Sequence, residues 1–201
     1  MRRSTSLLSR GAKGYGWYNK FMEGGNVAFE KYPPPTPFDW TANKVKRPTA
    51  YLEIAIDKEP QGKLVFELAS DIAPVSVVNF LNLCNGTNDK NFKYAGTSIH
   101  RMFKDHVLMG GDVENHDGTG NYSSFGQKYF RDENYIIPHS TRGLLSYVSN
   151  GVNTNGSQFY IGLGENKHMN GRCVVFGRLI AGGNILDDIE KVLSAKNIPP
   201  N

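Results

Sequence analysis

The sequence lacks the features that mark several large classes of protein. It has only two cysteines, Cys84 and Cys173, and no CxxC motif, which excludes a disulfide framework and favours a reducing compartment. No apolar run approaches the ~18 residues that a helix needs to span a bilayer, so we expect no membrane span. The five histidines show no metal-ligand spacing, and we expect neither a metal nor a cofactor.

Excess positive charge is confined to the first quarter of the chain. Residues 1–49 hold nine Lys or Arg and three Asp or Glu, a net charge of +6, whereas residues 50–201 hold fourteen and sixteen, a net charge of −2. A nucleic-acid-binding domain concentrates basic residues on its folded body. The distribution therefore argues against a nucleic-acid partner and for a basic arm or a targeting sequence.

Residues 1–22 are typical of a mitochondrial presequence. They contain five Lys or Arg, three serines, one threonine and no acidic residue, and Leu7 and Leu8 provide an apolar side. The alternative is an unstructured basic tail. We expect mitochondrial localisation, and because the segment is present from Met1 we expect that it is not cleaved.

Residues 23–47 are predicted to form an extended arm rich in proline and aromatic residues. Pro33–Pro35 favour polyproline II, and no helix can cross them. The arm and its flanks hold too many aromatic residues for a solvated linker: Trp17, Tyr18, Phe21, Phe29, Tyr32, Phe38 and Trp40. These side chains either pack on the chain's own domain or bind a partner protein, and we favour the partner.

Residues 48–195 form the predicted folded domain, followed by a short tail at 196–201. Alternating apolar residues predict strands on both sides of a hairpin at 57–62, and Pro74 is expected to begin a helix with Val77, Leu81 and Cys84 on its buried stripe. Further strands are expected at 97–103, 143–148, 157–163 and 174–180, and a second helix begins at Asn184 with Ile185, Ile189 and Val192 buried. Many strands, two helices and no β–α alternation predict a closed antiparallel β-barrel.

Arg101 is the charged residue that the strand pattern singles out. On the expected strand at 97–103 it shares a face with Ile99 and Phe103, and Gly110–Asp112 then break the pattern as a bulge or a tight turn would. A guanidinium keeps its charge in such a setting. Arg101 therefore either holds a ligand or pairs with a carboxylate elsewhere in the chain.

Seven motifs in sequence order make the chain resemble the cyclophilin family of peptidyl-prolyl isomerases over about residues 48–193. They are Ile99–Arg101, Gly110–Asp112, Gly118–Gly120, Asp132–Asn134, Gly143–Ser146, Asn153–Phe159 and Val174–Gly177. The resemblance implies a mostly β fold, a closed antiparallel barrel with two capping helices. It also implies that X-Pro peptides or protein segments bind in a groove on the outer wall of that barrel.

The resemblance assigns roles to individual residues. Arg101 matches the catalytic arginine, whose donor at the prolyl nitrogen weakens an amide resonance that sets a rotation barrier of ~18–20 kcal/mol. Gln158 matches the glutamine that hydrogen-bonds the substrate backbone. Other substrate-binding positions are expected at His100, His106, Val107, Met109, Gly118, Val148, Ser149, Tyr160, His168, Met169 and Cys173.

The proline pocket departs from the family pattern. His106 stands where the family has phenylalanine, His168 where it usually has tryptophan, and Val148 where it has alanine. His106 makes the pocket more polar and Val148 narrows the groove, so we expect weak proline binding. Cyclosporin-type ligands are expected to bind poorly because His168 replaces the tryptophan that binds them in the family. The alternative is that these changes are tolerated in an active enzyme.

The resemblance also implies one more strand after the helix that begins at Asn184, beside the first strand. Only Ile198–Asn201 remain beyond that helix, so we expect this strand to be missing and Tyr51–Ile56 to have an open edge. Either residues 23–49 or another protein then covers the edge, and we expect neighbouring subunits to bind there and along residues 1–47.

Three interpretations of the function are left open. We favour a peptidyl-prolyl isomerase domain of weak activity that is an accessory subunit of a large mitochondrial assembly. The alternatives are a purely structural subunit without catalysis, and a free mitochondrial folding helper.

Overall fold

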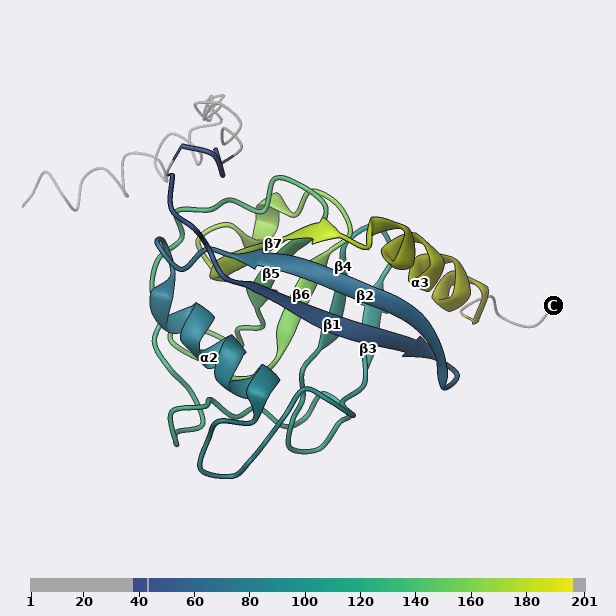
Figure 1. The fold of residues 1–201 in the computed structure, drawn as a ribbon, viewed down its shortest axis with the longest axis horizontal. Helices are drawn as coiled ribbons and strands as arrows, with labels where there is room; N and C mark the ends of the chain where they lie inside the picture. Colours follow the sequence, from purple (N-terminus) through teal and green to yellow (C-terminus); the bar gives the residue numbers. More distant parts are fainter. Residues whose placement is uncertain (1–37, 43, 197–201) are drawn as a thin grey trace, which may run out of the picture. The chain divides into compact units, whose positions relative to one another are not determined.

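The computed structural model describes residues 38–42 and 44–196 (Figure 1). The expected presequence-like segment, most of the extended arm and nearly all of the tail lie outside the described residues. The described residues comprise the expected folded domain and the last part of the arm.

Seven strands form one antiparallel sheet that curls into a half-barrel (Figure 1). Their order in the sheet is β1-β2-β7-β5-β6-β4-β3. The strands are β1 Thr49–Ile56, β2 Glu59–Leu68, β3 Arg101–Phe103, β4 Val107–Gly110, β5 Leu144–Tyr147, β6 Phe159–Gly162 and β7 Val175–Ala181. The mostly β prediction is confirmed.

Two helices, α2 (Pro74–Asn85) and α3 (Gly183–Lys196), accompany the sheet, with a short 3-10 helix, η1, at Lys167–Met169. Pro74 begins α2, as expected, because its missing N–H costs nothing in the first turn. The predicted buried stripe was partly wrong, since α2 buries Val77, Phe80 and Leu83, whereas Leu81 and Cys84 are only half-buried. Neither α2 nor α3 is long and apolar enough to cross a membrane, and no other described helix is.

The core lies on the concave face of the sheet. The ring of Phe80 on α2 packs against those of Phe159 and Phe176, at centroid distances of 5.9 and 5.3 Å. In the middle of the sheet Leu108, Ile161 and Leu145 are fully buried on adjacent strands. Because strand side chains alternate between faces, the residues next to these three point to the outer wall.

The described chain does not form the closed barrel that was expected. β1 and β3 are the two ends of the sheet, and no ladder joins them among the described residues. The strand expected at 97–103 is also shorter than predicted, because regular pairing with β4 begins only at Arg101. Two edges therefore face the gap where the barrel is open.

The hairpin between β1 and β2 is tighter than the 57–62 loop predicted. Asp57 and Lys58 make the whole turn, with φ of 51° and 74°. Positive φ at both positions is the signature of a type I′ turn, whose twist matches that of paired strands. Glu59 consequently already belongs to β2.

The last residues of the arm pack on the domain itself. Phe38 and Trp40 join a small cluster with Ile137 and Leu144 on the outer side of the sheet. For these two aromatic residues the preference for a partner protein was wrong, and the alternative of packing on the chain's own domain is what the structure shows. The other five aromatic residues lie outside the described part of the chain.

Candidate active site

Arg101 lies on the outer wall of the sheet. It is opposite Met109 on β4, which in turn is opposite Tyr160 on β6. The neighbouring pair of opposite residues on β4 and β6, Leu108 and Ile161, is fully buried in the core. Since opposite residues of antiparallel strands share a face, Arg101, Met109 and Tyr160 all point outward.

The guanidinium of Arg101 has no carboxylate partner in the described part of the chain, where none of the ion pairs involves it. The guanidinium carbon lies 6.0 Å from the centroid of the Phe103 ring. The side chain is exposed. The alternative that Arg101 serves a structural ion pair is therefore not what the described residues show, and its N–H donors are available to a ligand.

Beside this arginine the outer wall is hollowed into a cavity of about 380 Å³, which we call the socket. It brings together seven of the predicted substrate-binding residues, namely His106, Val107, Ser149, Tyr160, His168, Met169 and Cys173. The floor is apolar, because buried Val107, Met169 and Cys173 form a cluster against which Met109 and Tyr160 pack. The volume lies within the range of small-ligand sites.

Three further residues that the sequence analysis did not single out line the socket: Phe103, Asn166 and Arg172. Phe103 had a signal, because it shares the outer face with Arg101 two residues earlier on β3. Asn166 and Arg172 lie on the loops that flank η1, where no periodicity indicates which way a side chain points.

The wall of the socket is polar at His106. The side-chain amide of Asn166 donates to the carbonyls of His106 and Gly164, at 2.9 and 3.1 Å, which leaves its Oδ1 facing the ring, 3.3 Å from Nδ1 of His106. Because an amide oxygen only accepts, this assigns the proton of a neutral His106 to Nδ1 and leaves Nε2 as an acceptor. The ring of His168 stands edge-on to it, with centroids 5.9 Å apart.

The remaining polar atoms of the floor are neutral. Burial raises the pKa of the Cys173 thiol to about 11, so this side chain serves as a small apolar group rather than a nucleophile. Burial likewise raises the pKa of Tyr160. The socket therefore has an apolar floor, a polar imidazole wall and one cation, Arg172, in its lining.

Gln158 is fixed by the loop that follows Asp112. Its side-chain amide donates to the carbonyls of Gly118, at 3.0 Å, and Gly120. No described residue is hydrogen-bonded to its Oε1, which leaves an acceptor for a substrate N–H. Gln158 follows Ser157 directly before β6, two residues from Tyr160 and on the same strand face.

The loop itself is organised by the buried carboxylate of Asp112. It accepts five backbone N–H bonds, of 2.8–3.3 Å, from Glu114, Asn115, Asp117, Gly118 and Gly120. Burial raises the pKa of Asp112, but these hydrogen bonds lower it by more, so the pKa lies below its ordinary value. Asp112 therefore holds in place the carbonyls that orient Gln158.

Five of the predicted positions lie outside the lining of the socket: His100, Met109, Gly118, Val148 and Gln158. Gly118 packs on the imidazole of His100, since a Cβ there would lie 2.6 Å from the ring. Val148 is buried, and its N–H donates to the carbonyl of Gln158 at 3.0 Å. The prediction that Val148 narrows the groove therefore finds no support in the socket.

The arrangement offers hydrogen bonding and burial rather than covalent chemistry. An exposed guanidinium that has no carboxylate partner among the described residues lies on the same wall as an apolar-floored socket, and the carboxamide acceptor of Gln158 lies directly before β6. Among the described residues no cluster of His, Cys, Asp or Glu is placed to hold a metal ion. A comparison with known protein families matches residues 51–201 to the family described as cyclophilin type peptidyl-prolyl cis-trans isomerase/CLD.

Proposed function

Because this chain belongs to the cyclophilin-type peptidyl-prolyl cis-trans isomerase family, we propose that it binds X-Pro segments on its outer wall and catalyses their isomerisation weakly. The observation that carries the proposal is Arg101, a guanidinium without a carboxylate partner among the described residues, which stands beside the socket. A structural arginine would be paired, whereas a catalytic one must keep its donors free.

The chemistry needs only a donor and a socket. Rotation about an X-Pro amide faces a barrier of ~18–20 kcal/mol because the C–N bond is partly double. An N–H of Arg101 aimed at the prolyl nitrogen localises the lone pair of that nitrogen and lowers the barrier. The guanidinium stays protonated throughout, so no proton transfer and no covalent step is required.

In this scheme the remaining residues bind and orient the substrate. The proline ring enters the socket and packs on Val107, Met169 and Cys173. The Oε1 of Gln158 accepts an N–H of the substrate backbone, because the side-chain amide is already held by the loop. These contacts lower the rotation barrier only to the extent that they bind the twisted amide of the transition state more tightly than the planar amide of the ground state.

Weak activity is proposed because the socket wall is polar. A proline ring that displaces water from the Nε2 of His106 offers it no donor in return, and an unpaired polar atom is costly to bury. The exposed His168 adds a second imidazole to the same wall.

We also propose that the protein is an accessory subunit of a large mitochondrial assembly. Support comes from the basic, acid-free sequence of residues 1–22, from the aromatic arm, and from the open edge of β1. The second candidate, a structural subunit without catalysis, is favoured by the same open edge and by the polar socket.

The catalytic proposal is tested with the full chain in an assay that follows cis–trans isomerisation of an X-Pro peptide. We expect a rate above the spontaneous one, reduced roughly 100-fold by Arg101→Ala, the scale of losing one preorganised donor. Arg101→Lys should restore little, because an ammonium lacks the planar fork. Lys104→Ala, which removes an exposed cation one residue beyond β3, is the matched control and should match the wild type.

The outcomes separate the two candidates. Equal rates in the wild type and Arg101→Ala would refute the role of Arg101, and a wild type no faster than the spontaneous reaction would favour the structural subunit. Assembly membership is tested by the native size of the protein after gentle lysis of mitochondria. Recovery as a free monomer would contradict it.

A further inference from the structure

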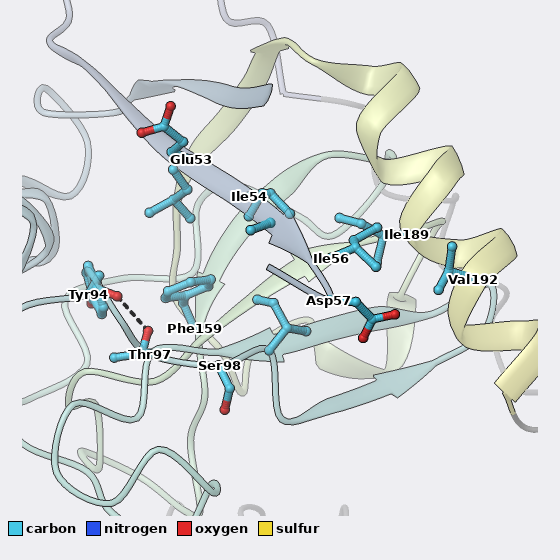
Figure 2. Close-up of a pocket in the computed structure, with 13 residues that line it drawn as sticks. Glu53, Ile54, Ile56, Asp57, Tyr94, Thr97, Ser98, Phe159, Ile189 and Val192 are labelled. Carbon is cyan, nitrogen blue, oxygen red and sulfur yellow. Dashed lines mark hydrogen bonds between the residues drawn. The ribbon is translucent and has the colours of Figure 1, made fainter. Parts of the chain in front are cut away.

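A second cavity, of about 490 Å³, opens where the half-barrel fails to close (Figure 2). We call it the slot. One side is β1 from Leu52 to Ile56 with Asp57 of the following turn, the other is the segment Thr97–Ile99 that precedes β3, and Phe159 lies between them. Ile189 and Val192 of α3 lie at one end, next to Ile56 and Asp57 (Figure 2). The slot shares no lining residue with the socket.

The edge of β1 presents unpaired backbone groups to this slot. Pro48 and Leu68 form a hydrogen-bonded pair, because the N–H of Leu68 donates to the carbonyl of Pro48 at 2.9 Å. The adjacent pair is Thr49 and Glu67. Bonded pairs alternate along antiparallel strands. The N–H and C=O groups of Tyr51 and Glu53 therefore point away from β2, into the open edge, where no described strand accepts them.

The floor of the slot is a part of the core whose apolar side chains are only partly buried. Leu52, Ile54 and Ile56 face inward but are only half-buried, whereas Leu64 and Phe66 on the neighbouring β2 are fully buried. Ile99, on the opposite side, is also half-buried. An occupant that completes this site needs apolar side chains at every second position and free backbone donors and acceptors, which is the description of a β-strand.

The charge and position of the slot indicate where that strand comes from. Its lining includes Glu53 but no Lys, Arg or His, so two β1 edges paired with each other would bring two Glu53 carboxylates close together. Phe38 and Trp40 pack over β5 and β7, and β2 and β1 lie between that position and the slot, so the chain before Phe38 would have to cross both strands to reach it. A second copy and the chain's own arm are thus both disfavoured.

We propose that the slot binds an extended segment of a partner protein as an added strand beside β1, with alternate aliphatic residues facing Phe159 and a Lys or Arg near Glu53. The segment completes the sheet through the backbone of Tyr51 and Glu53. This inference goes beyond the proposed isomerase and does not depend on it, because the slot and the socket are separate.

The test uses the full chain and a synthetic nine-residue peptide in which valine and threonine alternate and a lysine stands at each end. Titration calorimetry should give one site per chain. Glu53→Pro removes an N–H that points away from β2, which an edge strand tolerates, and should weaken binding at least tenfold. Glu53→Ala keeps that N–H and should weaken binding less than about threefold, since an exposed charge contributes little. Circular dichroism verifies that both variants fold.

Two further controls separate backbone pairing from nonspecific association. A peptide N-methylated at the amides that face β1 should not bind, and hydrogen exchange at the amides of Tyr51 and Glu53 should slow only with the unmodified peptide. Arg101→Ala should leave binding of the peptide to the slot unchanged while it reduces isomerisation roughly 100-fold, so failure of the slot and failure of the catalytic proposal are distinguishable.

The source of the strand is tested with a photocrosslinking amino acid at Ala55, an exposed position on β1. A crosslink to the added peptide, competed by unlabelled peptide, supports the proposal. A crosslink to residues before Phe38 in the purified chain identifies the chain's own arm as the occupant, and a crosslinked dimer identifies a second copy. Either of these results, or the absence of peptide binding, overturns the proposal.

Discussion

At the scale of single residues, His106 has the largest consequence for the proposed activity. Its Nδ1 is committed to Asn166, and its Nε2 acceptor has no partner among the described residues. The rest of the floor is apolar and well suited to a proline ring. The imidazole of His106 thus sets the free-energy cost of removing water from the socket.

We expect His106→Phe to raise the catalytic efficiency on X-Pro peptides roughly fivefold. The ring restores an apolar wall, and about 1 kcal/mol of transition-state binding corresponds to that factor. The measurement is kcat/KM in the isomerisation assay. His106→Gln, which keeps a polar wall, is the matched control and should bring no gain. If His106→Phe were no faster than the wild type, the imidazole would not be what limits proline binding.

Asp112 is the second residue of consequence, and its effect depends on pH. We expect Asp112→Asn to lower the free energy of unfolding at pH 7 by about 3 kcal/mol, because an amide cannot accept five N–H bonds and the loop loses a buried, charge-assisted network. Urea unfolding of the two proteins gives this difference.

The same difference should shrink in acid. The pKa of Asp112 is lower in the folded than in the unfolded state, so its contribution is full above the unfolded pKa of about 3.9 and is lost as the pH falls below it. His139, whose pKa burial lowers to about 4, titrates in both proteins and cancels in the comparison. A difference that stays constant from pH 6 to pH 3 would contradict the role assigned to the carboxylate.

At the scale of elements, Arg47 joins Trp40, in the described residues 38–42, to Asp71, which follows β2. The guanidinium of Arg47 pairs with both oxygens of Asp71, at 2.6 and 2.9 Å, and donates to the carbonyl of Trp40 at 2.7 Å. The guanidinium carbons of Arg47 and Arg178 lie 5.4 and 4.9 Å from the centroid of the Trp40 ring. The side chain of Arg47 is almost completely buried, so these contacts are shielded from water.

We expect Arg47→Met to lower the free energy of unfolding by about 3 kcal/mol, because it removes an almost completely buried guanidinium that forms a two-oxygen ion pair with Asp71 and donates to the carbonyl of Trp40. Chemical denaturation measures the loss. Lys46→Met, at an exposed neighbouring position, should change stability by less than about 0.5 kcal/mol. A loss below about 1 kcal/mol for Arg47→Met would mean that residues 38–42 are held by their aromatic side chains instead.

At the scale of the whole domain, the sheet keeps two separate surfaces. The outer wall carries Arg101 and the socket, while the gap between β1 and the segment before β3 carries the slot. A sheet that ends in two open edges exposes backbone groups that another chain can pair with. A protein of this shape can therefore be bound into an assembly through one surface and leave the other accessible to X-Pro segments.

The sequence by itself determined the features that follow from local geometry. Period-2 alternation placed β1 and β2, and Pro74 marked the start of α2. These predictions were confirmed because alternation and the missing N–H of proline act within a few residues. The length of the turn at Asp57 was missed because it depends on where pairing across the hairpin begins.

Only the tertiary structure decided which residues meet. Asn166 and Arg172 come beside His106 because η1 and its loops fold against β4 and β6, and no local pattern carries that information. The packing of Trp40 on Arg47 and Arg178, and the unpaired edge of β1, likewise depend on contacts between distant segments. Side-chain direction along a strand is a property of the backbone, whereas the neighbours of a site are set by which strands pair and how the loops between them pack.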